Sequence, residues 1–286
     1  MKTKTTFLAG LGLRAMFLLL LGALSAQAQE RTYEPVFSVG GGYTSGTYTP
    51  FWLRANQFGE VPTWESYWNA GMSAKMEYRK GRRADWAMGV SARVNLSETK
   101  SDFFFQEAYL KGKYGIFELS VGRQKYIQGL ADTTLSSGSY IWSGNALPMP
   151  KIELVVNEYW APGFLGGIVG FKGNYVHGWF DKDRSNVSQV YLHQKSFYGR
   201  LGKGSWPVKF YGGFNHQVQW GGTSRYLASS ITNAGGSKAN VVSDYLNVIT
   251  GKSLAGAGGD TATYGVNEGW NRLGNHLGTV DVGMEV

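Results

Sequence analysis

Cysteine is absent from the 286-residue chain. This absence excludes disulfide bonds, thiolate zinc sites, iron–sulfur clusters, a cysteine nucleophile and an N-terminal lipoprotein anchor. A metal ion would have to rely on the four histidines and on carboxylates. We therefore predict neither a metal site nor a cofactor.

Charge and long apolar runs are also scarce. Charged residues make up 17% of the chain, the mean hydropathy is −0.24, and hydropathy predicts no spanning helix after the N-terminal region. Glycine (41 residues) and aromatic residues (10 Trp, 17 Tyr and 15 Phe) are abundant. Disordered chains are poor in aromatic and hydrophobic residues. The composition therefore indicates a folded, β-rich chain and is compatible with a membrane β-barrel, whose strands give only a weak hydropathy signal.

The N-terminus has the pattern of a cleavable signal peptide. Lys2, Lys4 and Arg14 precede an apolar run at 15–24, and the small-residue motif Ala-Gln-Ala follows at 26–28. We predict residues 1–28 as the signal peptide, with cleavage after Ala28. Cleavage removes three cations and no anions, so the formal charge falls from +8 to +5. Because the mature chain is exported and only mildly basic, we expect no nucleic-acid partner.

Alternation with period two is the main secondary-structure signal in the mature chain. In 66–79 and 86–97, one face is apolar or aromatic and the other is polar, with Lys75, Glu77 and Arg93 near mid-strand. A soluble β-sandwich also alternates, but its strands are shorter and their flanks need no aromatic residues. The pattern favours an outer-membrane β-barrel. The apolar faces consist of Trp68, Ala70, Met72, Ala74, Met76 and Tyr78, and of Trp86, Met88, Val90, Ala92, Val94 and Leu96.

Ten strand-like segments follow one another along residues 29–286. The longest connections, 125–151 and 221–272, are predicted to face outward, because outer-membrane barrels have long extracellular loops and short periplasmic turns. Within the second, 243–251 has the spacing of a short helix. The chain ends at 281–286 without the terminal aromatic residue common in bacterial barrels. We therefore expect an all-β, antiparallel transmembrane barrel that is incomplete at its C-terminus.

Several dispersed passages resemble the Wzi-type capsule assembly family of outer-membrane barrels, in the same order. The resemblance spans about residues 30–286 and implies an 18-stranded barrel that acts as a lectin, holding capsular or related polysaccharide at the cell surface. Expected partners are that polysaccharide and outer-membrane lipid, and we expect a monomer. The passages are 121–124 (VGRQ), 145–150 (NALPMP), 192–200 (LHQKSFYGR), 213–222 (GFNHQVQWGG) and 274–278 (GNHLG).

The outward loops supply candidate glycan-binding residues. Sugar rings pack their C–H groups on aromatic faces, and their hydroxyls pair with amides and guanidinium groups. The alternative for each aromatic residue is that it packs within its loop or lies at the lipid interface. The candidates are Tyr126, Tyr140, Trp142, Asn145, Arg225, Tyr226, Tyr245 and Trp270.

Catalytic motifs are lacking around the histidines. No His-x-Ser pair of a lipid hydrolase and no His-x-x-x-His zinc spacing occurs, and the glycine-rich stretch 256–260 lacks the Lys-Ser/Thr of a phosphate loop. We therefore predict a non-enzymatic protein that attaches or organises surface polysaccharide. The alternatives are a porin or solute channel and, from a third class, a lipid-modifying enzyme.

Overall fold

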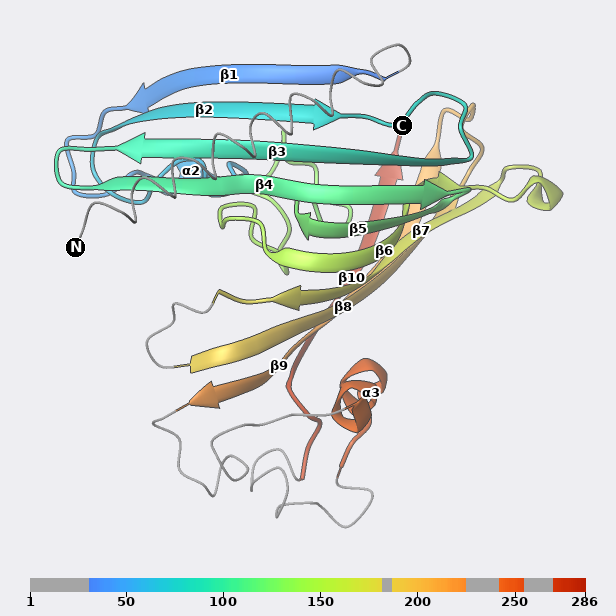
Figure 1. The fold of residues 1–286 in the computed structure, drawn as a ribbon. Helices are drawn as coiled ribbons and strands as arrows, with labels where there is room; N and C mark the ends of the chain where they lie inside the picture. The colour runs from blue at the N-terminus through green and yellow to red at the C-terminus, as the bar shows by residue number, and fades with distance from the viewer. Residues whose placement is uncertain (1–30, 182–186, 225–241, 255–269) are drawn as a thin grey trace.

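The computed structural model describes residues 31–181, 187–224, 242–254 and 270–286. The predicted signal peptide lies outside this part. Ten strands form one antiparallel sheet in which each strand pairs only with its neighbours in sequence (Figure 1). The strands are β1 (Tyr33–Gly42), β2 (Tyr67–Met76), β3 (Ala84–Leu96), β4 (Ser101–Tyr114), β5 (Phe117–Arg123), β6 (Pro150–Trp160), β7 (Val169–Trp179), β8 (Val187–Leu201), β9 (Lys209–Ser224) and β10 (Asn275–Glu285).

Helical structure is minor. It comprises α2 (Phe51–Arg54), the 3-10 turn η1 (Gly163–Leu165) and α3 (Val242–Thr250) among the described residues. None of the described helices is long and apolar enough to cross a membrane. The predictions of an all-β chain, ten strands and a short helix near 243–251 are confirmed.

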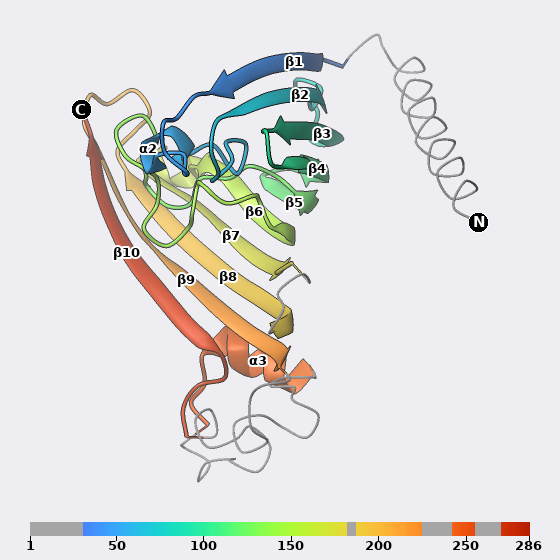
Figure 2. The same ribbon diagram turned by 90° about the vertical axis from the view of Figure 1, so that its left-hand side faces the viewer.

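The connections differ between the two ends of the sheet. One end, called here the short-turn end, carries the connections 77–83, 115–116, 161–168 and 202–208. The opposite, long-loop end carries 43–66 and 124–149, among others. The sheet is strongly curved, with β1 and β10 as its two edges, and α2 lies on the concave side (Figure 2).

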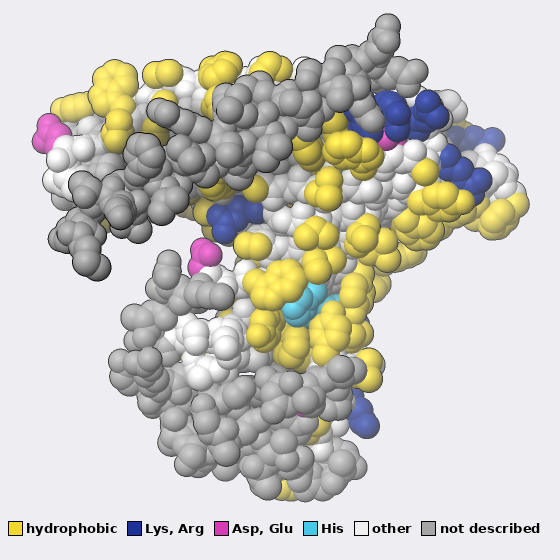
Figure 3. Space-filling model, in the orientation of Figure 1, with side chains coloured by type: hydrophobic (Ala, Val, Ile, Leu, Met, Phe, Trp, Pro, Cys, Tyr) yellow, Lys and Arg dark blue, Asp and Glu magenta, His cyan; other side chains and the backbone are white. Residues whose placement is uncertain are grey.

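The convex face of the sheet exposes large hydrophobic side chains. Alternation places them on one side of every strand, and Figure 3 shows such side chains spread over much of the visible surface. Soluble proteins rarely expose a continuous apolar surface of this extent. Examples with 45–83% exposure are Phe37, Val39, Trp68, Phe103, Leu110, Leu119, Leu154, Phe197, Phe214 and Val280.

On the concave face, polar side chains are buried, whereas in most soluble proteins they are exposed. Small residues make room for them: a Cβ at Gly71 would clash with Arg93, and one at Gly213 would clash with the ring of Tyr198. The concave face is therefore largely polar, whereas a buried apolar cluster of Val218, Trp220, Val248 and Leu273 lies on the other side of β9. Side chains at most 6% exposed on the concave face are Asn95, Gln106, Glu107, Lys151, Glu153, Asn174, Gln194 and Asn215.

Two irregularities interrupt the alternation. The β3–β4 register shifts between Ser91 and Ala92, and the consecutive residues Gln106 and Glu107 opposite them are both buried. The β6–β7 register shifts between Val156 and Trp160. A β-bulge re-aims side chains in this way, and both bulges add groups to the concave face.

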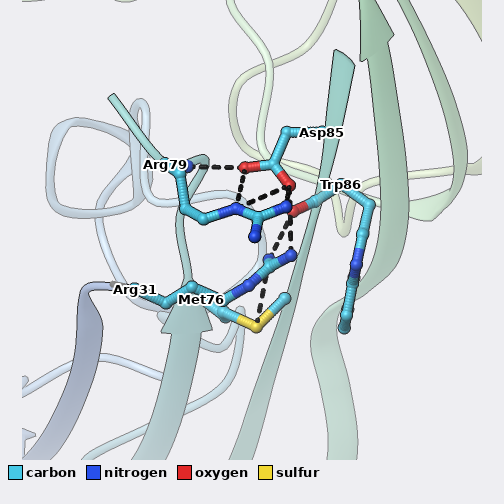
Figure 4. A network of polar contacts seen from close by, with 5 residues as sticks. All are labelled: Arg31, Met76, Arg79, Asp85 and Trp86. Carbon is cyan, nitrogen blue, oxygen red and sulfur yellow. Dashed lines mark hydrogen bonds and ion pairs between the residues drawn. The ribbon is translucent and has the colours of Figure 1, made fainter. Parts of the chain in front are cut away.

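A buried ion-pair cluster anchors the start of β1 (Figure 4). Arg31 Nη2 lies 3.1 Å from Asp85 Oδ1, and both side chains are at most 1% exposed. Asp85 also accepts hydrogen bonds from the backbone N–H (2.7 Å) and Nη2 (2.8 Å) of Arg79. Arg31 donates to the carbonyl of Trp86 at 2.7 Å and lies over its ring. Because each charge is paired, the cluster ties the edge strand β1 to β3 across β2.

One predicted face assignment is wrong. Tyr78 was assigned to the apolar face with Met76, but β2 ends at Met76. The Tyr78 hydroxyl donates to Glu118 at 2.9 Å, and its ring lies beneath the ammonium groups of Lys111 and Lys113. Strand alternation cannot be extended past the last ladder residue, so Tyr78 belongs with the polar side.

Candidate functional site

Two segments from the long-loop end, 43–66 and 124–149, fold back over the concave face and contact each other. We call them the inward loops. Phe58 N donates to Gly144 O at 2.7 Å, and Asn56 N donates to Asn145 Oδ1 at 3.2 Å. The Asn56 amide also donates to the carbonyls of Thr133 and Ser136. Asn145, predicted as a glycan-binding residue, therefore joins one loop to the other.

Charged and amide groups fasten the inward loops to the sheet. Arg93 pairs with Glu60 at 2.8 Å, and the amide of Gln106 donates to the carbonyls of Gln57 and Phe58. On the same face, Lys75 pairs with Glu107 at 3.2 Å. The ionic groups in this half of the concave face thus neutralise one another.

Beneath the second inward loop lies a hollow of about 330 Å³ around Tyr126. The Tyr126 hydroxyl accepts a hydrogen bond from Asn174 at 3.0 Å, and the Lys151 ammonium lies 4.3 Å from the centre of its ring. Lys151 in turn pairs with Glu153 at 2.7 Å. Burial raises the pKa of Tyr126, so its hydroxyl stays protonated and able to donate as well as accept.

The hollow continues toward the short-turn end. Two neighbouring hollows, of about 70 and 480 Å³, share Asn157 with it. Asn157 follows the β6 bulge and is exposed, so the bulge places an amide at the junction. We call this continuous depression the concave groove. Its lining includes Tyr78, Lys111, Lys113, Glu118, Gln124, Lys125, Tyr126, Lys151, Glu153, Asn157, Tyr159, Lys172 and Tyr198.

The chemistry of the groove suits a hydroxyl-rich ligand. Tyrosine rings offer flat apolar surfaces, and amides, carboxylates and ammonium groups offer donors and acceptors at short intervals. No group of three or more histidine or acidic residues able to hold a metal ion occurs in the described part of the chain.

The other predicted site residues are dispersed. Tyr140 is 98% exposed, Trp270 is exposed and Trp142 is half-buried. Arg225 and Tyr226 lie outside the described residues. Among the predicted site residues that the structure describes, Tyr126 alone lines the groove.

Tyr245 lies elsewhere, on α3, which packs against the convex face. Its ring stacks on Trp220 at 5.4 Å between centroids and contacts His177 and His193. Its hydroxyl lies 3.2 Å from that of Tyr175. Tyr245 therefore holds the helix on the sheet.

Strand pairing brings all four histidines of the chain onto the convex face of β7–β10. His177 is opposite His193 in the ladder, and His216 Nε2 lies 3.0 Å from His276 Nδ1. Lys195, on the same face, donates to Ile249 O near the end of α3. Histidine side chains appear among hydrophobic ones in Figure 3. The helix covers polar groups on an otherwise apolar face.

Sequence reasoning missed most of the groove. Lys151 and Glu153 are two residues apart at the start of a strand, a spacing that could have indicated two side chains on one polar face. Asn157 and Tyr159 depend on the bulge in β6, and no feature of the local sequence marks it.

Comparison of the chain with protein-family models, with curated proteins and with solved structures gives no match.

Proposed function

We propose that the sheet is part of an outer-membrane β-barrel, with the convex face toward lipid and the concave face toward the lumen. The distribution of side chains supports this proposal, because lipid favours apolar side chains outside while a wet lumen accepts charge. Both edge strands carry strongly exposed apolar residues, such as Val39 (82%) and Val282 (83%). Further strands at these edges would complete a larger barrel, as the 18-stranded architecture of the Wzi-type family implies.

The proposed activity is non-catalytic: the protein retains or organises capsular or related polysaccharide at the cell surface. The observation that carries this proposal is the concave groove, in which Tyr126, Asn157 and the Lys151–Glu153 pair offer flat rings and hydrogen-bonding groups side by side. Such a combination is suited to sugar rings and their hydroxyls. In this proposal the inward loops form the entrance, and the ligand contacts lie beneath them.

The alternative of an open porin is less well supported. The inward loops occupy part of the concave face and are fastened there by Arg93–Glu60 (2.8 Å) and by the Gln106 amide. A porin requires a continuous water-filled path. We expect purified protein in planar bilayers to give little or no steady conductance. A large open-pore current would favour the channel.

Gene deletion tests the proposed function directly. Cells lacking the protein should shed polysaccharide that wild-type cells retain, and the wild-type gene should restore retention. Asn157→Ala should restore it poorly, because the side chain lines the groove and forms no hydrogen bond with another described residue, so its loss should affect the ligand rather than the fold. Tyr140→Ala, which alters a fully exposed loop residue, is the matched control and should restore retention. Unchanged retention in the deletion strain would overturn the proposal.

A further inference from the structure

The two halves of the concave groove differ in how their charges are matched. Near the inward loops, Lys151 pairs with Glu153 and Lys125 lies 4.0 Å from Glu60. Toward the short-turn end, Lys111, Lys113 and Lys172 line the groove, and none of them forms an ion pair with any residue in the described ranges. The cations of this half lack the partners that the other half provides.

Tyrosine rings take the place of carboxylates beside these lysines. The Lys113 ammonium lies 4.6 Å from the centre of the Tyr78 ring, and the Lys111 ammonium lies 5.1 Å from it. Lys172 lies 5.0 Å from the Tyr159 ring and 5.7 Å from the Tyr198 ring. Cation–π contacts orient an ammonium group without pairing it with an anion, so these ammonium groups remain available to an anionic ligand.

Arg200 is a further cation that lies beside a tyrosine ring in this half of the groove. The Arg200 guanidinium lies 5.7 Å from the Tyr159 ring. Its Nε atom and the Tyr159 hydroxyl are both buried, with no hydrogen-bond partner among the described residues. Buried polar groups in folded proteins are nearly always satisfied. These two groups on one tyrosine–arginine pair beside the groove are open to hydrogen bonds from a ligand or from water.

No acidic residue in the described ranges forms an ion pair with Lys111, Lys113 or Lys172. Asp281 accepts the Tyr198 hydroxyl at 2.8 Å, and Glu285 pairs with Lys209 and interacts electrostatically with Arg200. Glu118 accepts the Tyr78 hydroxyl and stands opposite Lys113 in the ladder without forming an ion pair. Glu158 is exposed. Lys111 is only 9% exposed, and a buried cation without an anion is costly. An incoming anionic group would therefore be bound most favourably beside Lys111 and Lys172.

We propose that the short-turn half of the concave groove binds the carboxylate groups of an acidic saccharide, with Lys111, Lys113, Lys172 and Arg200 as the recognising residues. This inference rests on the proposed function and narrows it from saccharides in general to saccharides that carry uronic acid units. The tyrosine rings between the cations pack against the sugar, which distinguishes the site from one for a free inorganic anion.

Calorimetric titration of the purified full chain in detergent tests the inference. The probes are a tetramer of galacturonic acid, the neutral tetramer of galactose, and inorganic phosphate. We expect the acidic tetramer to bind at least tenfold more tightly than the neutral one at low ionic strength, with a preference that shrinks as salt is added. The double variant Lys111→Gln/Lys172→Gln should bind the acidic tetramer at least tenfold more weakly than the wild type does and should lose the preference for it over the neutral tetramer.

Lys80→Gln/Lys252→Gln is the matched control, because it removes the same charge from exposed positions outside the groove. It should bind both tetramers as the wild type does. Equal affinity for the two tetramers overturns this inference and leaves the proposed function standing. Phosphate binding as tight as that of the acidic tetramer also overturns it. Absence of binding by either tetramer contradicts both the inference and the proposed function.

Discussion

Glu153 and Leu154 are neighbours in β6, yet the first is buried on the concave face and the second is exposed on the convex face. Glu153 is 5% exposed and paired with Lys151, whereas Leu154 is 46% exposed on the convex face. In a water-soluble protein the carboxylate would be outside and the leucine inside. The comparison shows that this sheet buries polar contacts on one face and exposes apolar side chains on the other.

Removing the charge on the concave side should have the largest effect. Glu153→Ala leaves the buried ammonium of Lys151 without an anion and removes one of the two acceptors of the Asn174 amide, the other being the Tyr126 hydroxyl. We expect a loss of about 3–5 kcal/mol in the free energy of unfolding, measured by urea unfolding in phospholipid vesicles. Glu153→Gln, which retains an acceptor for Asn174, should lose less. A loss below about 1 kcal/mol would show that water solvates this pair as it does a surface pair.

Placing a charge on the convex side should have the next largest effect. Leu154→Arg is expected to cost about 2–4 kcal/mol in vesicles if mid-strand residues of the convex face contact lipid hydrocarbon. Leu154→Met, which preserves volume and apolar character, is the control and should cost less than about 1.5 kcal/mol. An arginine tolerated as well as methionine would contradict a lipid-facing convex surface.

The smallest effect is expected at α3, which covers the histidines on the convex face. Tyr245→Ala removes the ring that packs between Trp220 and the histidines. We expect the docking of α3 to weaken by about 1–2 kcal/mol, seen as faster hydrogen exchange of residues 244–250 with unchanged exchange in β2–β5. Leu246→Ala, on the exposed side of α3, should leave exchange unaltered. If both variants behave alike, Tyr245 is not the contact that holds the helix.

Most of the fold could be predicted from the sequence because period-two alternation encodes both strand and face. The opposite faces at Met72 and Ser73, or at Val90 and Ser91, follow directly from it. The bulges at Gln106 and near Asn157 could not be predicted, because a bulge depends on the partner strand and leaves no local pattern. Alternation therefore predicts a face, and a bulge can change it.

The candidate site was harder to predict than the fold. Tyr126 follows a strand and was predicted to act in an outward loop, but Asn174, 48 residues away, holds it over the concave face. The histidines are 16, 23 and 60 residues apart along the chain, and only the register of four strands brings them together. Long-range pairing of this kind is not contained in any sequence window.

The order of the strands has a consequence for how the sheet assembles. Because β1 to β10 pair strictly with their neighbours in sequence, each new hairpin can be added to the edge of the preceding one, and no strand has to be inserted between two others. Loop closure is shortest at the short-turn end, such as the two residues between β4 and β5, and longest between β9 and β10. The Arg31–Asp85 contact spans 54 residues and locks the first three strands together. The first three strands are thus held together by a buried side-chain contact as well as by their ladders.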